Sequence, residues 1–276
     1  MSQRSETLPP ELADAFARVR GRLGGLGRSL LYFPILGSTN DVALTLAADR
    51  EREGAVVISD AQTAGRGRRG RTWFSPPAGG LYVSVVLAPG RAALEPDRAT
   101  ALLTLAAGVA LAEAVEASTG LGPDIKWPND LLVGGRKLAG ILAEGLAADP
   151  GAARGVTNVV LGYGINVGPM AYPPELAARA TSLEAELGRP IDRAALCAET
   201  VAALAARYDD LLAGRFDAIL DGWRRRAPGS QGARVSWEAS SRVETGVTAG
   251  VDERGALLVR VGDRIEHIVA GELTWF

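Results

Sequence analysis

The chain has 276 residues, long enough to bury a substantial hydrophobic core without disulfides or a structural metal. Its 30 Lys and Arg residues stand against 32 Asp and Glu residues, and the resulting net charge of −2 excludes the overall basic excess that drives non-specific nucleic-acid binding. The single cysteine, Cys197, excludes an internal disulfide and a thiolate zinc site. We find no uninterrupted apolar run of membrane-spanning length and no secretory signal, so we expect a cytoplasmic protein.

The N-terminal part of the chain predicts two helices and two strands in alternation. Residues 11–23 carry apolar side chains at helical spacing, and residues 30–36 predict the strand that follows. Ser38 stands at the N-cap of the next helix with Asp41 at its N3 position, which predicts a capping box. Residues 54–59 predict a buried strand.

The segment 61–80 has no apolar periodicity and is rich in Gly, Arg and Pro. A segment of this length without regular structure inside a compact domain is usually functional or disordered. Residues 81–87 then predict a strand, and residues 97–118 predict a long helix rich in Ala and Leu. Short strand patterns follow at 125–127, 131–133, 138–146 and 157–161.

The last third of the chain changes from helical to strand patterns. Asp192 is expected to cap a helix that runs to Leu212 and carries an apolar stripe. Residues 227–232 (APGSQG) form the one clear boundary, and residues 233–276 alternate valines with polar residues. Turns that separate short strands are predicted here at 252–255 and 261–264.

These elements predict an α+β fold with two units. Residues 1–227 are expected to form a mixed β-sheet backed by helices, because strands and helices are interspersed along them. Residues 228–276 are expected to form a small β-barrel-like domain, because they carry strand and turn patterns only.

The run GRGRRGRTW at 65–73 combines four arginines with three glycines. Glycine lets the backbone approach a ligand closely, and the planar fork of arginine suits carboxylate and phosphate groups. One interpretation is therefore an anion clamp, in which Trp73 stacks on a base or covers a hydrophobic ligand. A solvated basic loop or an RNA-binding patch explains the same composition equally well.

Two further motifs lie downstream. Two lysines and a carboxylate lie around a predicted hairpin, and these three side chains are expected to converge. They belong to the runs KWPND at 126–130 and RKLAGILAE at 136–144. An ordinary hairpin with a Pro-Asn-Asp turn and solvated lysines explains this pattern as well. The run GYGINV at 162–167 places Asn166 in an apolar setting, where a buried amide must either bind a ligand or satisfy backbone groups.

From about residue 32 to its end the chain resembles the biotin protein ligase family. The resemblance rests on GRGRRGRTW, KWPND with RKLAGILAE, and GINV, which stand in the family's order with Ser38-Thr39-Asn40 upstream. It implies a mixed sheet like that of class II aminoacyl-tRNA synthetases and biotin ligases, followed by a small C-terminal SH3-like β-barrel. The monofunctional type is expected, because the roughly thirty residues before the first strand are too few for a winged helix-turn-helix.

The resemblance implies a two-step reaction. ATP activates biotin to biotinyl-5′-AMP, and the biotinyl group is then transferred to a lysine of the biotin carboxyl carrier domain of a carboxylase. Biotin and ATP are the implied substrates, with Mg²⁺ bound through ATP, and residues 61–78 are the expected lid over the adenylate. We expect no specific DNA binding, no membrane association, and a monomer or a homodimer.

The resemblance also assigns roles by position. The implied catalytic residues are Lys137, Arg68 and Lys126, and Asp130 is a candidate for magnesium. The residues that match the biotin side of the family's site are Ser38, Thr39, Asn40, Gln62, Gly65, Arg66, Gly67, Arg68 and Lys137. Those that match the ATP side are Arg68, Arg71, Trp73, Asn129, Asp130, Lys137 and Asn166.

Several interpretations compete with this assignment. Lipoate protein ligases have a related fold, and a nucleic-acid-binding regulator would use the arginine-rich loop. The run Ser38-Thr39-Asn40 is also explained as a helix cap, a role compatible with ligand binding. His267 and Cys197 are expected to be structural. Tyr163 stands where the family often has a smaller residue, which leaves the packing beside Asn166 open.

Overall fold

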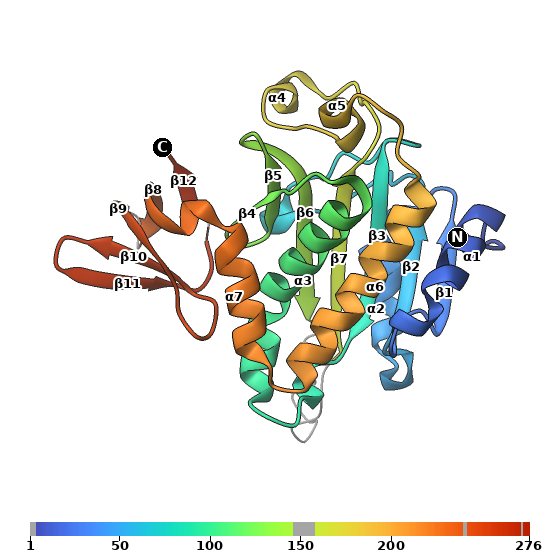
Figure 1. Cartoon of the computed structure of the whole chain (residues 1–276), viewed down its shortest axis with the longest axis horizontal. Helices are drawn as coiled ribbons and strands as arrows, with labels where there is room; N and C mark the ends of the chain where they lie inside the picture. The colour runs from blue at the N-terminus through green and yellow to red at the C-terminus, as the bar shows by residue number, and fades with distance from the viewer. Residues whose placement is uncertain (1–3, 146–157, 240–241, 272) are drawn as a thin grey trace.

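The computed structural model describes residues 4–145, 158–239, 242–271 and 273–276. The helices are α1 (Pro10–Val19), α2 (Thr39–Ala47), α3 (Pro96–Thr119), α4 (Pro174–Ala177), α5 (Leu183–Leu187), α6 (Arg193–Leu212) and α7 (Phe216–Arg226). A seven-stranded sheet is built from β1 (Ser29–Phe33), β2 (Ala55–Ser59), β3 (Gly80–Leu87), β4 (Asp124–Lys126), β5 (Asp130–Val133), β6 (Arg136–Gly145) and β7 (Val159–Asn166). Figure 1 shows α3 and α6 in front of this sheet and α2 behind it.

The sheet is mixed, as predicted, and has the strand order β1-β2-β3-β7-β6-β5-β4. Only β1 and β2 run parallel, and every other neighbouring pair is antiparallel. All residues of β2 and β3 are buried, because helices or loops cover both faces of the sheet at its centre. This explains why both strands have nearly continuous apolar sequences. The prediction of a helix-backed mixed sheet is confirmed.

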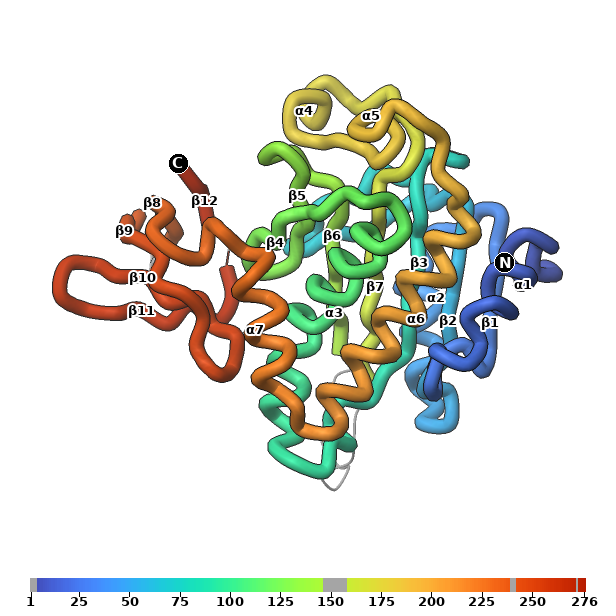
Figure 2. Tube along the Cα trace, in the orientation of Figure 1, coloured from blue at the N-terminus to red at the C-terminus, as the bar shows by residue number. Residues whose placement is uncertain are grey.

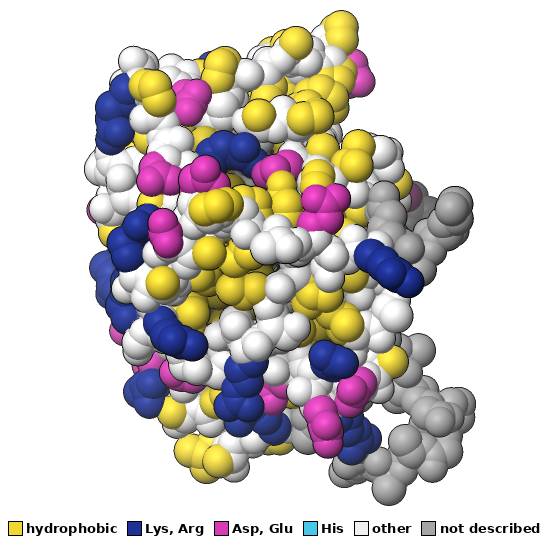
Figure 3. Space-filling view, turned by 90° about the vertical axis from the view of Figure 1, so that its right-hand side faces the viewer, with side chains coloured by type: hydrophobic (Ala, Val, Ile, Leu, Met, Phe, Trp, Pro, Cys, Tyr) yellow, Lys and Arg dark blue, Asp and Glu magenta, His cyan; other side chains and the backbone are white. Residues whose placement is uncertain are grey.

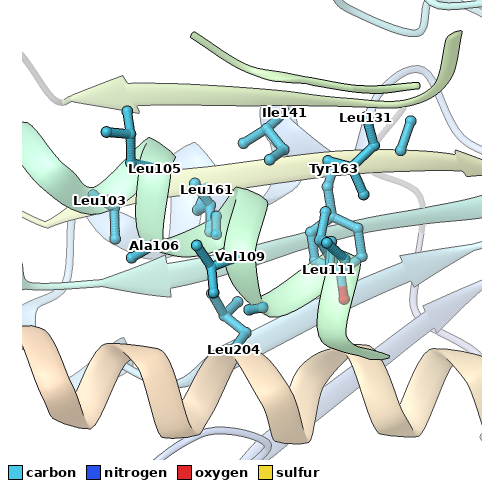
Figure 4. Packing of buried hydrophobic residues seen from close by; sticks show 14 of the residues in the cluster. Leu103, Leu105, Ala106, Val109, Leu111, Leu131, Ile141, Leu161, Tyr163 and Leu204 are labelled. Atoms are coloured by element: carbon cyan, nitrogen blue, oxygen red, sulfur yellow. The ribbon is translucent and has the colours of Figure 1, made fainter. Parts of the chain in front are cut away.

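The main hydrophobic core lies between the sheet and the layer of α3 and α6. Leu103 and Val109 of α3 pack among strand residues such as Leu161 and Tyr163, and Leu204 of α6 lies next to Val109 (Figure 4). By length and composition α3 could cross a membrane, but 72% of its most apolar window is buried inside the fold. It is therefore the core helix of this domain.

Strand β7 is longer than the sequence predicted. The expected strand at 157–161 begins in a part of the chain outside the described residues, and the strand continues to Asn166. Its glycines lie directly beneath other side chains: a Cβ on Gly162 would be 1.9 Å from Asn40 Oδ1, and one on Gly164 would be 2.3 Å from Trp73 Nε1. The glycines therefore serve close packing within a strand and do not end it.

The predicted capping box at the start of α2 is wrong in its hydrogen bonds. Ser38 occupies the N-cap with an extended backbone, but its side chain makes no capping hydrogen bond. The Thr39 backbone N–H instead donates to Gln62 Oε1 at 2.8 Å, and Asp41 forms an ion pair with Arg66. Acceptors and cations from the 61–80 segment thus take the place of the local cap.

Helices α4, α5 and α7 were not predicted. In α7 the buried residues Phe216, Ile219, Leu220 and Trp223 follow helical spacing, so the pattern was present in the sequence. Helices α4 and α5 have only four and five residues, too few for an amphipathic pattern to appear. By contrast, α6 begins as predicted, with the Asp192 carboxylate accepting a hydrogen bond from Ala195 N at 2.9 Å.

A second, antiparallel sheet contains β8 (Gln231–Ala239), β9 (Arg242–Val251), β10 (Leu257–Val261), β11 (Arg264–Ile268) and β12 (Leu273–Trp275) in the order β11-β10-β9-β8-β12. The predicted small β unit is confirmed, although its edge strands β11 and β12 do not pair within the described residues, so the barrel is not closed. Figure 2 shows it in red at one end of the long axis, with the N-terminal segment in blue at the other. Whether residues 1–227 and 228–276 are separate domains stays a prediction.

The two sheets share a core and are linked by polar contacts. Val235 and Leu257 of the second sheet belong to the main hydrophobic cluster. The Trp127 indole N–H donates to the Gly255 carbonyl at 3.0 Å, and Arg98 Nε donates to the Glu253 carbonyl at 2.9 Å. The C-terminal unit is thus packed against α3 and the KWPND segment.

Charged side chains of both signs are interspersed on the face that carries α1 and β1 (Figure 3). Oppositely charged side chains at the surface of the protein also pair with one another, such as Arg22 with Glu199 at 2.5 Å and Arg91 with Glu53 at 2.7 Å. Such mixed charge agrees with the net charge of −2 and differs from the continuous basic face of nucleic-acid-binding proteins.

Candidate active site

One cavity of about 330 Å³ brings together the three sequence motifs. Its wall comes from α2, the loop between β2 and β3, the β5–β6 hairpin, β7, and the segment around α4. Every predicted site residue except Gly65 lines it, namely Ser38, Thr39, Asn40, Gln62, Arg66, Gly67, Arg68, Arg71, Trp73, Lys126, Asn129, Asp130, Lys137 and Asn166. Residues separated by more than one hundred positions in sequence therefore meet at one site.

Strand β7 forms the floor of the cavity and sets the order of the groups along it. Its alternate residues 162, 164 and 166 face the cavity, with Asn40 over Gly162 and the Trp73 ring over Gly164. Successive residues on one face of a strand are about 6.7 Å apart. The amides of Asn40 and Asn166 thus lie toward opposite ends of this floor.

Tyr163 points away from the cavity floor, which settles its packing. The residue is 4% exposed, and its side chain lies in the main core, with its hydroxyl 2.9 Å from Thr200 Oγ1. Burial raises the pKa of the Tyr163 hydroxyl well above its ordinary value. The side chain of Tyr163 therefore packs on the opposite face of the sheet from Asn166.

Hydroxyl and amide groups line one end of the cavity. Thr39 N–H and Oγ1 both approach Gln62 Oε1, at 2.8 and 3.1 Å, and Gln62 Nε2 donates to Ser75 Oγ at 2.9 Å. Ser84 lies beneath them on β3, fully buried, with its Oγ 2.6 Å from Asn40 Oδ1. Ser84 was not predicted as a site residue, because a single serine within a buried strand belongs to no recognisable motif.

Gly65 is the predicted site residue that the structure places elsewhere. A Cβ at this position would be 2.4 Å from the Trp73 carbonyl oxygen and 2.6 Å from Ser75 Oγ. The loop closes on itself here, with Trp73 N–H donating to the Gly65 carbonyl at 2.9 Å and Gly67 N–H donating to the Arg71 carbonyl at 2.7 Å. Gly65 therefore allows the loop to fold and is packed inside it.

Cationic groups lie over the middle of the floor. Lys137 Nζ is 2.7 Å from Asp130 Oδ1 and 5.4 Å from the centroid of the Trp73 ring. Arg68 Nη1 donates to Asn129 Oδ1 at 2.9 Å, which ties the glycine-arginine loop to the KWPND segment. This arrangement suits an anionic ligand, because two positive charges converge within a partly closed cavity.

Lys126 connects the cavity to the C-terminal sheet. Its Nζ lies 5.6 Å from the centroid of the Trp275 ring on β12. Gly271 and Leu273, which flank the start of β12, also line the cavity. The C-terminal unit thus contributes part of the wall, which the motifs alone did not predict.

Asn166 makes hydrogen bonds to backbone groups. Its Nδ2 donates to the carbonyls of Thr181 at 3.0 Å and Lys137 at 3.4 Å. Two backbone hydrogen bonds also connect Lys137 to the segment 179–181. The Lys137 N–H donates to the Arg179 carbonyl, and the Lys137 carbonyl accepts from the Thr181 N–H. Of the two alternatives for this amide, the structure supports satisfaction of the backbone; its role at the ATP side stays a prediction.

The segment 172–180 covers one side of the cavity and was not predicted as part of the site. Tyr172, Leu176, Arg179 and Ala180 line the cavity. The Tyr172 hydroxyl donates to the Thr181 carbonyl at 3.0 Å, and burial raises the pKa of Tyr172 to about 12. No motif marks this segment, because its position follows from its attachment to β6 and Asn166.

Cys197 and His267 do not line the cavity, as expected. Cys197 is fully buried in α6, and His267 Nδ1 lies 2.9 Å from Asp252 Oδ2 in the C-terminal sheet. In the described ranges no group of three or more His, Cys, Asp or Glu residues has the arrangement of a metal site. Any metal at this cavity would depend on ligand atoms as well as on protein carboxylates.

The chain matches the Biotin/lipoate A/B protein ligase family over residues 32–166. The biotin-[acetyl-CoA-carboxylase] ligase of Mycobacterium tuberculosis is 34% identical over 264 residues, which cover 92% of this chain and 93% of that protein. This chain belongs to the family. The bifunctional ligase/repressor BirA of Bacillus subtilis is 34% identical over 267 residues, covering 96% of this chain and 79% of that protein.

Solved structures show the same fold. The structure of the biotin protein ligase from Aquifex aeolicus in complex with biotin and ATP has a TM-score of 0.74 and 27% identity to this chain. It covers 90% of this chain and 99% of the Aquifex chain, so the similarity includes both sheets. The family resemblance seen in the sequence motifs is thereby confirmed over almost the whole chain.

Proposed function

We propose that this chain is an ATP-dependent biotin protein ligase. It forms biotinyl-5′-AMP from biotin and ATP and then transfers the biotinyl group to a lysine of an acceptor protein. The observation that carries this proposal is the convergence of Lys137, Arg68 and the Thr39–Gln62 pair on one cavity of about 330 Å³. Family membership and the likeness to biotin ligases with bound biotin and ATP support it.

The chemistry requires two anions to meet. The biotin carboxylate attacks the α-phosphorus of ATP, forming a C–O–P bond as the bond to pyrophosphate breaks. We assign charge stabilisation in this step to Lys137 and Arg68, with Lys126 as a further cation, because cations fixed before the reaction stabilise developing negative charge. No histidine or cysteine lines the cavity, so positioning and charge are the sources of catalysis.

We place the two substrates by the order of groups along β7. Biotin is assigned to the end lined by hydroxyls and amides, with Ser38, Thr39, Asn40 and Gln62, and the arginine-rich loop beside it. ATP is assigned to the end that contains Asn129, Asp130 and Asn166, with Arg71 and Trp73 facing it. Residues 61–78 are proposed to close over the adenylate, which protects a hydrolysable mixed anhydride from water.

Magnesium is proposed to enter with ATP. Asp130 supplies one carboxylate at the cavity, beside Lys137, and a single carboxylate together with phosphate oxygens matches the usual way in which proteins bind Mg²⁺. The ion would neutralise phosphate charge. The cations of the chain would still hold the reacting groups in line.

In the second step the amine of the acceptor lysine attacks the biotinyl carbonyl, and AMP leaves. The acceptor is proposed to be the biotin carboxyl carrier domain of a carboxylase, because the M. tuberculosis relative is a biotin-[acetyl-CoA-carboxylase] ligase. A cytoplasmic location, a monomeric or homodimeric state and the absence of specific DNA binding are further parts of the proposal.

The deciding experiment is biotin-dependent exchange of labelled pyrophosphate into ATP by the purified protein. We expect exchange that requires biotin and is not supported by lipoate. Exchange with lipoate and none with biotin would reassign the chain to lipoate ligation. Binding to duplex DNA or RNA that falls steeply with salt, without exchange, would instead support a nucleic-acid-binding regulator.

A further inference from the structure

Glu144 on β6 joins two separate segments of the cavity wall. Its Oε2 accepts a hydrogen bond from Asn40 Nδ2 at 2.7 Å, and its Oε1 pairs with Arg66, which also pairs with Asp41. Asn40 is 4% exposed and the Glu144 side chain 22% exposed, so this contact is largely shielded from water. One carboxylate thus holds both a residue of α2 and a residue of the glycine-arginine loop.

The position of the Asn40 amide is fixed by packing, but its orientation is not. A Cβ at residue 162 would lie 1.9 Å from Asn40 Oδ1, so the amide rests directly on the strand. On its other side is Ser84 Oγ, at 2.6 Å from Oδ1. A hydroxyl both donates and accepts, so Ser84 would tolerate either the oxygen or the nitrogen of the amide.

An ionised carboxylate, by contrast, only accepts hydrogen bonds. Glu144 therefore requires Asn40 to turn Nδ2 toward it and Oδ1 toward Ser84. This leaves one N–H and one lone pair of the amide for a ligand, in a defined arrangement. Biotin has a polar head with both N–H donors and a carbonyl acceptor, so its recognition depends on which atom each site residue presents.

We propose that Glu144 is a positioning residue for biotin: it sets the orientation of the Asn40 amide and anchors the loop through Arg66. The inference rests on the proposed function and deepens it. Glu144 does not line the cavity, so it acts through its two partners. The isosteric variant Glu144→Gln tests this, because its amide keeps the shape but removes the charge and accepts at only one of its two terminal atoms.

The experiment measures biotin binding by isothermal titration calorimetry without ATP, for the wild-type full chain and for Glu144→Gln. We expect the dissociation constant for biotin to rise about tenfold, the loss expected when one charge-assisted hydrogen bond is removed. The KM for ATP should stay within about twofold, since a general loss of structure would affect both substrates. In an Asn40→Ala background the same substitution should have a smaller effect, because the two residues act together.

Two carboxylates provide matched controls. Asp41→Asn removes the other partner of Arg66 and leaves the Asn40–Glu144 bond, so it should weaken biotin binding less than Glu144→Gln does. Glu116→Gln removes an exposed carboxylate that pairs with Arg226, and since neither residue lines the cavity, it should leave biotin binding unchanged. Glu144→Asp keeps the charge on a side chain that is too short to reach both partners. It replaces Glu144→Gln in the binding experiment if the Gln variant does not fold.

The outcomes are separable. Unchanged biotin affinity in a folded Glu144→Gln or Glu144→Asp variant, or equal weakening of biotin and ATP, would overturn the positioning role while leaving the ligase proposal intact. The positioning role would also be overturned if Glu144→Gln weakened biotin binding equally in the wild-type and the Asn40→Ala backgrounds. A wild-type protein that binds no biotin would remove the proposed function itself.

Discussion

Replacing Lys137 with alanine separates its contribution to catalysis from its contribution to stability. In the free protein this side chain is 36% exposed, pairs with Asp130 at 2.7 Å and lies 5.4 Å from the Trp73 ring centroid. Partly exposed ion pairs and cation–π contacts each contribute about 0.5–1 kcal/mol, so the free energy of unfolding should fall by roughly 1–2 kcal/mol. The domain should remain folded.

The expected catalytic loss is larger. A cation at the reacting carboxylate and phosphate stabilises the transition state by about 3 kcal/mol or more, which corresponds to a rate loss of over about 100-fold. Biotin-dependent pyrophosphate exchange measures this rate, and urea denaturation measures stability. Arg136→Ala is the matched control, since the adjacent side chain is 48% exposed, pairs with Glu186 at 2.6 Å and does not line the cavity. A folded Lys137→Ala enzyme with exchange close to wild type would refute the assigned role.

Three further results are expected. Gly164→Ala places a Cβ 2.3 Å from Trp73 Nε1 and should lower the free energy of unfolding by about 1–3 kcal/mol in urea denaturation. Gly145→Ala, whose Cβ would have no atom of the described residues within 4 Å, should lower it far less. Burial raises the pKa of the Cys197 thiol to about 12, so iodoacetamide at about pH 8 should modify it only on unfolding, and rapid labelling of native protein would contradict this. Trypsin should cut the free enzyme within residues 66–71, and biotin with ATP together should suppress that cleavage; equal cutting with and without ligands would exclude a lid.

The sequence predicted most of the site because its motifs consist of residue types with restricted uses. The arginine-glycine run at 65–73 and the KWPND segment can be recognised from sequence alone, and the structure places both at one cavity. Ser84 and Glu144 were missed, because their importance depends on Asn40, which lies 44 and 104 positions away. Such partners follow from strand order and register, which local patterns do not specify.

The errors in the predicted secondary structure also come from contacts between distant segments, which local sequence patterns do not show. Gly162 and Gly164 suggested the end of a strand, since glycine is unfavourable within one. In the fold they make room for Asn40 and Trp73, a need that arises only when distant segments pack together. The predicted cap of α2 failed for a related reason: Gln62, 23 positions from Thr39, supplies the acceptor.

The hydrogen bond from the Trp127 indole to the Gly255 carbonyl has a consequence for engineering. A gene truncated after residue 227 would encode a protein that lacks this acceptor, the Trp275 ring beside Lys126, and the part of the cavity wall formed by Gly271 and Leu273. Exchanging C-terminal sheets between relatives would likewise replace part of the substrate cavity. Chimeras should therefore be divided so that the KWPND segment and the C-terminal sheet come from the same parent.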